Sequence, residues 1–362
     1  MIDGPVRTEM TDLQLNCPQD DLDYIFAESV DSWEALRGKR LFITGGTSFV
    51  GCWMLESLAW ANHRLDLGAS AVVLTRNVSA FTYRFPQLTS LECLSFIEGD
   101  ARSFAFPAGE FSHVIHAATE APTKANEGQP LLKFDTMVHG TQRALEFARQ
   151  CGAQKFLLTS SGVVYAKPRA GMTHLPEDYD GAPDPTNADL VNGEGKRASE
   201  MLCALYHRQF GLDTTIARLF SFVGPYVQLG FHYAVGNFIR DGLSGGPIRI
   251  TGDGTPRRSF LYGGDLAAWL WVILFRGEPC RPYNVGSEDV TTIAELAGLV
   301  AQSVHPAVEV RIAGRAMPTA VREGYVPSTQ RARMELGLRQ ATSLPRAIQR
   351  TIDWYAVRGL EA

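Results

Sequence analysis

A glycine-rich turn near residue 45 has the residue types and spacing of a phosphate-binding turn. The segment Thr44-Gly-Gly-Thr-Ser-Phe-Val-Gly51 follows an apolar run typical of a buried strand and leads directly into an apolar stretch long enough for a helix. Glycines in such a turn let the backbone approach a pyrophosphate, which the free N–H groups at the helix N-terminus stabilise. A plain strand-to-helix turn is the alternative, but the strand, turn and helix together favour a dinucleotide site.

This turn resembles the Thr-Gly-x-x-Gly-x-x-Gly fingerprint of extended short-chain dehydrogenases/reductases, the family of nucleotide-sugar epimerases, dehydratases and reductases. Further motifs in the family's order extend the resemblance over about residues 39–338. They are Gly99-Asp100, His116-Ala-Ala-Thr119, Arg218-Leu-Phe-Ser-Phe-Val-Gly-Pro225, Gly252-Asp-Gly-Thr-Pro-Arg-Arg-Ser-Phe-Leu-Tyr262 with Asp265, and Tyr283-Asn-Val-Gly286. The resemblance implies NAD or NADP as the cofactor and a nucleotide-activated sugar as the substrate.

Two cofactor positions depart from the family pattern. Ser48 replaces the middle glycine, and its hydroxyl could donate a hydrogen bond to the pyrophosphate. Arg76 follows the second predicted strand where an acid would hold the ribose 2′-hydroxyl, so either it accommodates a 2′-phosphate or it is a solvated charge. The full set that the resemblance assigns to the cofactor is Gly45, Thr47, Ser48, Phe49, Val50, Gly51, Arg76, Asp100, Ala101, Ala117, Ala118, Thr119 and Lys196.

Hydride chemistry at a sugar hydroxyl needs a group that takes the hydroxyl proton. The family uses a tyrosine and a lysine four residues apart on one helix face, together with a serine or threonine. The resemblance implies Ser161 as the hydroxyl member and Lys196 as the lysine. Four residues before Lys196 stands Asn192, whose amide cannot exchange a proton near neutral pH. Glu194 lies two residues from both, about 200° around the helix from each, so it cannot simply take over. Tyr165, for which a structural role is favoured, and His232 and Tyr233, for which a loop role is favoured, are the other titratable side chains considered.

The residues after Ser161 narrow the reaction. Sugar 4,6-dehydratases of the family place an Asp-Glu pair there and nucleotide-sugar decarboxylases an acid nearby, whereas this sequence has Gly162 and Val163. The resemblance therefore favours an epimerase-like or ketoreductase-like reaction and disfavours 4,6-dehydration. Asn192 keeps a second hypothesis open, a cofactor- and nucleotide-sugar-binding protein with impaired catalysis and a structural or regulatory role.

Besides Ser161, four further residues match positions at which the family contacts its substrate. Asn237 and Phe238 stand where an amide and the following backbone meet the nucleotide diphosphate. Arg258 matches an arginine that pairs with phosphate or ribose, and a guanidinium fork suits a diphosphate. Ser221 replaces an asparagine at another phosphate contact. The resemblance thus implies a nucleotide-sugar site formed by the second half of the chain.

These residues need a fold that brings several strand ends together. Short, fully apolar strands alternate with longer helices, which predicts an α/β fold with a doubly wound parallel sheet, Rossmann-like and covered on both faces. The predicted strands span residues 40–44, 71–75, 94–98, 113–117, 155–160 and 214–218, and the predicted helices span residues 50–65, 131–151 and 193–210.

We interpret the chain as three parts. Residues 1–38 form an N-terminal arm, residues 39–218 a dinucleotide-binding domain, and residues 219–362 a smaller nucleotide-sugar-binding domain that is partly interleaved with it. Shorter elements are predicted in that domain at residues 231–241, 248–251, 291–302 and 344–357. The helices predicted at 131–151 and 193–210 carry apolar stripes, and in the family the matching helices pair across a two-fold axis, which implies a homodimer.

Composition limits the remaining possibilities. The 362 residues include no run of eighteen apolar residues and carry a net charge of −5, so we expect neither a membrane span nor a nucleic-acid partner. The N-terminus has no signal-peptide pattern. The six cysteines show no CxxC spacing and the eight histidines no paired-ligand spacing, so we expect no metal. Reduced thiols indicate a cytoplasmic protein.

Overall fold

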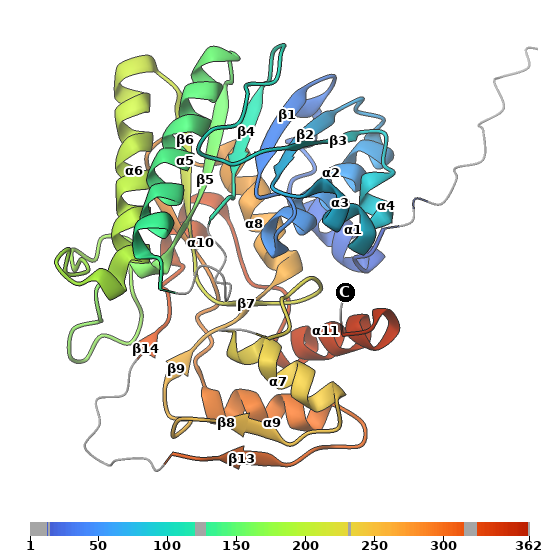
Figure 1. The fold of residues 1–362 in the computed structure, drawn as a ribbon, viewed down its shortest axis with the longest axis vertical. Coiled ribbons are helices and arrows are strands. Elements are labelled where there is room, and N and C mark those ends of the chain that lie inside the picture. The colour runs from blue at the N-terminus through green and yellow to red at the C-terminus, as the bar shows by residue number, and fades with distance from the viewer. Residues whose placement is uncertain (1–12, 14, 120–127, 231–232, 315–323, 361–362) are drawn as a thin grey trace, which may run out of the picture.

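The computed structural model describes residues 13, 15–119, 128–230, 233–314 and 324–360. Its centre is a parallel sheet of seven strands in the order β11-β6-β5-β4-β1-β2-β3 (Figure 1). The first strand, β1, lies inside the sheet and the chain builds outward from it in both directions, so the predicted doubly wound α/β fold is confirmed. The strands are β1 (Arg40–Thr44), β2 (Ser70–Thr75), β3 (Leu94–Glu98), β4 (His113–His116), β5 (Lys155–Ser161), β6 (Asp213–Leu219) and β11 (Pro282–Val285).

Both faces of the sheet are covered because side chains alternate along each strand. In β1, Leu41 and Ile43 belong to one apolar cluster and Phe42 to another. The first cluster includes α2 (Phe49–Leu65) and α8 (Gly263–Arg276), and the second includes α5 (Pro130–Gln150) and α6 (Val191–Phe210). Figure 1 shows α5 and α6 side by side on their face of the sheet. Two layers of helices therefore hold the strand ends in fixed positions.

Most predicted elements of the first half lie within two residues of the observed ones. The strand predicted to end at Ala117 ends at His116, and the helix predicted to begin at Gly193 begins at Val191. The sequence did not predict α8 or β11. Residues 263–274 of α8 are all buried, so the helix lacks the polar face that marks a surface helix, and β11 lies in a segment that the sequence identified only as the Tyr283-Asn-Val-Gly286 motif. Both follow residue 218 and return to the large sheet, where β11 pairs with β6.

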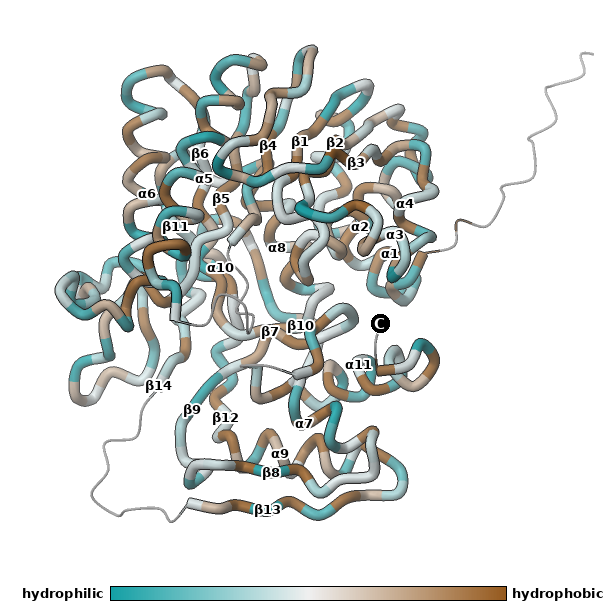
Figure 2. The backbone as a smooth tube through the Cα atoms, viewed as in Figure 1, coloured by the Kyte–Doolittle hydropathy of each residue, from teal (hydrophilic) through white to brown (hydrophobic). Residues whose placement is uncertain are grey.

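The second half of the chain also forms a smaller lobe below the sheet in Figure 1. Its helices α7 and α9 carry alternating hydrophobic and hydrophilic residues, as helices with one buried face do (Figure 2). The division at residue 218 stays a prediction. The further elements of the second half, of which α10 packs on β11 and α8 of the large sheet layer, are β7 (Phe222–Val223), α7 (Ala234–Leu243), β8 (Ile248–Ile250), β9 (Arg257–Arg258), β10 (Leu261–Tyr262), β12 (Thr291–Thr292), α9 (Ile293–Ser303), β13 (Val310–Ile312), β14 (Gly324–Tyr325), α10 (Gln330–Leu336) and α11 (Leu344–Arg358).

The described part of the N-terminal arm packs on α2 and α8. It forms α1 (Gln19–Glu28) and a short 3-10 helix (Trp33–Leu36). Asp21 of α1 is buried, accepts a hydrogen bond from the Tyr262 hydroxyl and forms an ion pair with Arg350 of α11. The arm thus connects the sheet helices with the C-terminal helix.

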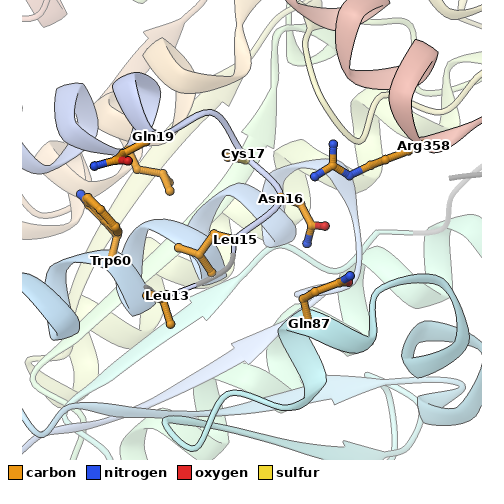
Figure 3. A pocket seen from close by; sticks show the side chains of 9 residues that line it. Leu13, Leu15, Asn16, Cys17, Gln19, Trp60, Gln87 and Arg358 are labelled. Carbon is orange, nitrogen blue, oxygen red and sulfur yellow. The ribbon is translucent and has the colours of Figure 1, made fainter. Parts of the chain in front are cut away.

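A pocket of about 370 Å³ lies where the arm meets α2, α11 and α4 (Pro86–Thr89), which follows α3 (Val78–Arg84). Figure 3 shows Leu13 and Leu15 of the arm near Asn16 in this pocket, with Arg358 reaching in from α11. No residue that the sequence assigns to cofactor or substrate lines it.

Candidate active site

The turn between β1 and α2 has no room for side chains at its glycines. Gly45 has φ +71°, and a Cβ there would lie 2.5 Å from the backbone of Ala117 and Ala118. A Cβ on Gly51 would lie 2.3 Å from the backbone of Gly46. The turn and the segment after β4 therefore touch backbone to backbone, and the N-terminus of α2 is left accessible to a pyrophosphate as the sequence predicts.

Ser48 is the N-cap residue of α2. Its hydroxyl donates a hydrogen bond to the Gly45 carbonyl at 2.7 Å and accepts one from the Gly51 N–H at 3.2 Å. The side chain is exposed at the turn, but its proton is used within the turn itself. The serine that replaces a family glycine thus supplies a helix cap.

Hydrogen bonds join the cofactor segments predicted on three strands. The Thr44 hydroxyl is hydrogen-bonded to His116 at 2.7 Å and accepts a bond from the Ala118 N–H at 3.3 Å. The Thr47 and Thr75 hydroxyls lie 3.2 Å apart. Burial lowers the pKa of His116 to about 3, so its imidazole is neutral. The structure therefore brings together the ends of β1, β2 and β4. Of the other assigned residues, Val50 and Ala117 are buried, Phe49 and Ala101 are partly buried and Thr119 is exposed.

Asp100, at the end of β3, is held by an arginine that the sequence reasoning missed. Arg102 donates to both carboxylate oxygens of Asp100, at 2.9 and 2.7 Å, and to Asp135 of α5 at 2.9 Å. These hydrogen bonds, and then the charge of Arg76, lower the pKa of Asp100. Arg76 is exposed and near enough to act on that carboxylate. The spacing of Arg102, two residues after Asp100, is the signal that would have found it.

The structure brings Ser161 and Lys196 to one strand end. Ser161 is the last residue of β5, and its hydroxyl accepts a hydrogen bond from the Val163 N–H at 3.3 Å. Lys196 of α6 is buried, and its ammonium donates to the Thr159 carbonyl at 2.8 Å, two residues before Ser161. Burial lowers the pKa of Lys196 to about 8, although the charge of Glu200 opposes this shift.

Asn192 lies in the first turn of α6, one turn before Lys196, with an exposed side chain. Tyr165 is not a free phenol, because its hydroxyl donates to Asn284 and accepts from Arg218, both at 2.8 Å. Glu194 lies 3.8 Å from Arg197. Tyr233 caps α7, and His232 lies outside the described residues. Of the described positions, Asn192 has no titrating group, and the groups of Tyr165 and Glu194 already have partners.

The predicted substrate residues lie on three different elements. Asn237 of α7 lines a pocket of about 420 Å³. The side chain of Phe238 is buried in the core, so only its backbone can meet a ligand. Ser221 is half-buried before β7, and Arg258 of β9 donates to the Arg257 carbonyl at 2.8 Å. Polar residues of that pocket which the sequence reasoning missed are Arg240, Asp241, Ser244 and Arg249.

Two absences concern only the part of the chain that the structure describes. Within it, no three histidine, cysteine or acidic side chains are grouped so that they could hold a metal ion. Within the same residues, no helix is both long and apolar enough to cross a membrane.

Fold and site define a dinucleotide-binding α/β protein, and the chain belongs to the NAD dependent epimerase/dehydratase family, whose profile matches residues 41–286. UDP-glucuronic acid decarboxylase 1 of Danio rerio is 27% identical over 98% of this chain and 80% of its own. UDP-glucuronic acid decarboxylase 3 of Arabidopsis thaliana is 34% identical over 75% of this chain and 77% of its own. The family resemblance expected from the motifs is confirmed.

Solved structures with the same fold include one with cofactor. Epimerase Mth375 from Methanothermobacter thermautotrophicus superposes with a TM-score of 0.76 at 22% identity, over 92% of this chain and 96% of its own. DesIV, a dTDP-glucose 4,6-dehydratase from Streptomyces venezuelae with NAD bound, superposes with a TM-score of 0.72 at 24% identity, over 88% of this chain and 97% of its own. The predicted cofactor class is thereby confirmed, and the backbone-lined turn before α2 fits a dinucleotide.

Proposed function

We propose that this protein carries out NAD-dependent hydride transfer at a hydroxyl-bearing carbon of a nucleotide-activated sugar, in an epimerase-like or ketoreductase-like reaction. The observation that carries the proposal is the hydrogen bond from the Lys196 ammonium to the Thr159 carbonyl, which fixes the lysine beside the strand end of Ser161. Because β1 and β5 are parallel strands of one sheet, Ser161 lies at the same edge as the dinucleotide turn.

The chain's own residues have separate tasks in this reaction. NAD, when bound, takes up and returns the hydride. Ser161 offers a hydroxyl to the sugar oxygen, and the Lys196 ammonium offers charge and hydrogen bonds to the cofactor ribose. Arg258 and Asn237 supply the guanidinium and amide that suit a diphosphate. Substrate is thus held from the smaller lobe while chemistry occurs at the sheet edge.

The two residues after Ser161 favour this class over elimination or decarboxylation. Gly162 and Val163 carry no acid, and the Val163 side chain is exposed there. The relatives named UDP-glucuronic acid decarboxylases make UDP-glucuronic acid the first alternative substrate to test.

The second candidate function is that of a cofactor- and nucleotide-sugar-binding protein with impaired catalysis. The observation that favours it is Asn192, an exposed amide one turn before Lys196, where the family has its tyrosine. Such a protein would bind both ligands and turn over neither.

We further propose a cytoplasmic homodimer. The six cysteines are all free, as a reducing compartment implies. Exposed apolar side chains on α5 and α6 support the dimer.

The decisive experiment incubates purified protein and NAD with UDP-glucose, UDP-N-acetylglucosamine, dTDP-glucose and UDP-glucuronic acid, and identifies products by NMR. We expect an epimer, or a keto-sugar formed together with NADH when a ring hydroxyl is oxidised, and no product from Lys196→Ala. Carbon dioxide release from UDP-glucuronic acid would replace the proposal with decarboxylation. Calorimetric binding of cofactor and sugar without any turnover would support the second candidate.

A further inference from the structure

A tyrosine outside the family motif brings a phenol to the strand end that carries Ser161. Tyr325 is the last residue of β14, and its hydroxyl lies beside Gly162, the residue that follows Ser161. Strand β14 pairs with β9 so that Tyr325 lies opposite Arg258, whose guanidinium carbon is 5.9 Å from the centre of the tyrosine ring. One side chain therefore lies near both the strand end of the candidate catalytic serine and the candidate phosphate-binding arginine.

Gly162 leaves the space that this phenol occupies. A Cβ on Gly162 would lie 2.5 Å from the Tyr325 hydroxyl oxygen and 2.6 Å from the ring of Phe220. The Phe220 and Tyr325 rings are 4.7 Å apart and pack on each other. Any side chain at position 162 would therefore collide with the phenol as it is placed. This chain has a phenol from β14 in a space that a side chain following Ser161 would otherwise fill.

The hydroxyl of Tyr165, which also lies near Ser161, already has two hydrogen-bond partners. It donates to Asn284 and accepts from Arg218, and burial raises the pKa of Tyr165 to about 12. Asn192 offers only an exposed amide. Tyr325, by contrast, brings its hydroxyl next to Gly162, directly after the serine.

We propose that Tyr325 is a catalytic residue, the phenol that contacts the reacting sugar oxygen together with Ser161 and takes the role of the tyrosine missing at Asn192. This assignment rests on the proposed function. In the reducing direction, the sugar carbonyl carbon gains hydride and its electron pair from the cofactor, and the oxygen gains the Tyr325 proton. The phenolate left behind lies near the Arg258 guanidinium and regains a proton from water. Oxidation of the alcohol is the reverse.

The electrostatics suit a phenol that holds its proton until the oxygen develops charge. Burial raises the pKa of Tyr325, while the Ser161 side chain and the charge of Arg258 lower it. The resting form is thus neutral, and the nearby guanidinium stabilises the anion that forms on proton transfer.

The test uses Tyr325→Phe, which keeps the ring packed on Phe220 and removes only the hydroxyl. Turnover of the best nucleotide sugar should fall by about 10²–10⁴, the contribution of a positioned acid or base. Nucleotide-sugar affinity, measured by calorimetry, should change by less than about threefold because the phosphate contacts remain. The matched control is Tyr179→Phe, from the same apolar cluster, whose hydroxyl donates to the Lys167 carbonyl and whose loss should leave turnover unchanged.

A rescue experiment separates catalysis from packing. If Tyr325 stands in for the absent tyrosine, Asn192→Tyr in the Tyr325→Phe background should raise turnover about tenfold or more, and Asn192→Phe in that background should not. Turnover of Tyr325→Phe within twofold of the natural protein overturns the assignment and leaves the proposed function intact. A natural protein that turns over no nucleotide sugar overturns the proposed function, and with it any catalytic role of Tyr325.

Discussion

Lys196 is a buried cation with few compensating contacts. Its ammonium donates to the Thr159 carbonyl, and the nearby Glu200 accepts hydrogen bonds from Arg218 and from Ser160. The pKa of about 8, against an ordinary value of 10.5, means that the folded state binds this proton less tightly than the unfolded state does. Burial of this charged ammonium at the end of β5 therefore lowers the free energy of unfolding.

Replacing this lysine should therefore stabilise the protein. Lys196→Met should raise the free energy of unfolding at pH 7 by about 1–3 kcal/mol, since one pKa unit corresponds to about 1.4 kcal/mol. Stability of the natural protein should rise with pH between about 8 and 10.5, where the unfolded chain binds more protons, and the variant should lack this rise. Urea denaturation across pH measures both. Lys155→Met, which removes a half-exposed partner of Asp213, is the control and should bring no gain. A less stable Lys196→Met would contradict the account.

Arg76 is the residue for which we predict a preference between the two cofactors. It is exposed after β2 and its charge acts on Asp100, so a 2′-phosphate would add an anion beside it. We expect NADP to bind more tightly than NAD, and Arg76→Ala to remove the difference at a cost of about 1.5–3 kcal/mol for a charge-assisted contact. Fluorescence titration with each dinucleotide measures this. Arg84→Ala, a neighbouring arginine that lies over Phe85, should keep the ratio. Equal affinities in the natural protein would show that Arg76 does not discriminate.

At the scale of elements, the junction of β1 and α2 depends on backbone contact. Gly51→Ala should abolish dinucleotide binding, because its Cβ would lie 2.3 Å from the Gly46 backbone and displace the helix N-terminus. The matched control is Gly298→Ala in α9, where a Cβ meets nothing within 4 Å. That change should stabilise the protein by about 0.5–1 kcal/mol and leave binding intact. Calorimetric titration with NAD and thermal unfolding report the two effects, and normal NAD affinity in Gly51→Ala would refute the prediction.

The sequence predicts those elements whose pattern is local. Apolar runs predict strands such as β1 and β5, and periodic apolar stripes predict helices such as α5. The spacing of the family motifs locates Ser161 and Lys196. Helix α8 is buried along most of its length and lacks the polar face that marks a surface helix. Strands of two residues, such as β9 and β14, have no period at all.

Tyr325 was not predicted from the sequence for the same reason, because no local pattern points to it. Tyr325 reaches the strand end of Ser161 only because β14 pairs with β9, and the two strands are separated by more than sixty residues of chain. No local pattern encodes that pairing. Arg102 is different, because its spacing from Asp100 is a local signal and only its contact with Asp135 of α5 depends on the fold.

At the scale of the whole molecule, α5 and α6 direct some of their apolar side chains toward the sheet and others toward solvent. Leu145 and Phe147 of α5 are buried against the sheet. Met201 and Leu205, one turn apart on α6, are 61% and 50% exposed, and Leu131 at the start of α5 is 84% exposed. Covering its own sheet therefore uses only part of the apolar surface of this helix pair, and the remainder is available to a second copy.

The proposed homodimer should depend on the exposed apolar side chains of α5 and α6. In a two-fold pair each copy presents the same patch to the other, so a change on α6 enters the interface twice. Met201→Glu combined with Leu205→Glu would force four carboxylates into the interface, where desolvation and mutual repulsion oppose association. We expect the natural protein to have a dimeric mass by light scattering at micromolar concentration and the double variant a monomeric one. Val357→Glu on α11, where the side chain is 82% exposed, adds charge elsewhere and should leave the mass unchanged. A monomeric natural protein would show that the exposed stripe has another role.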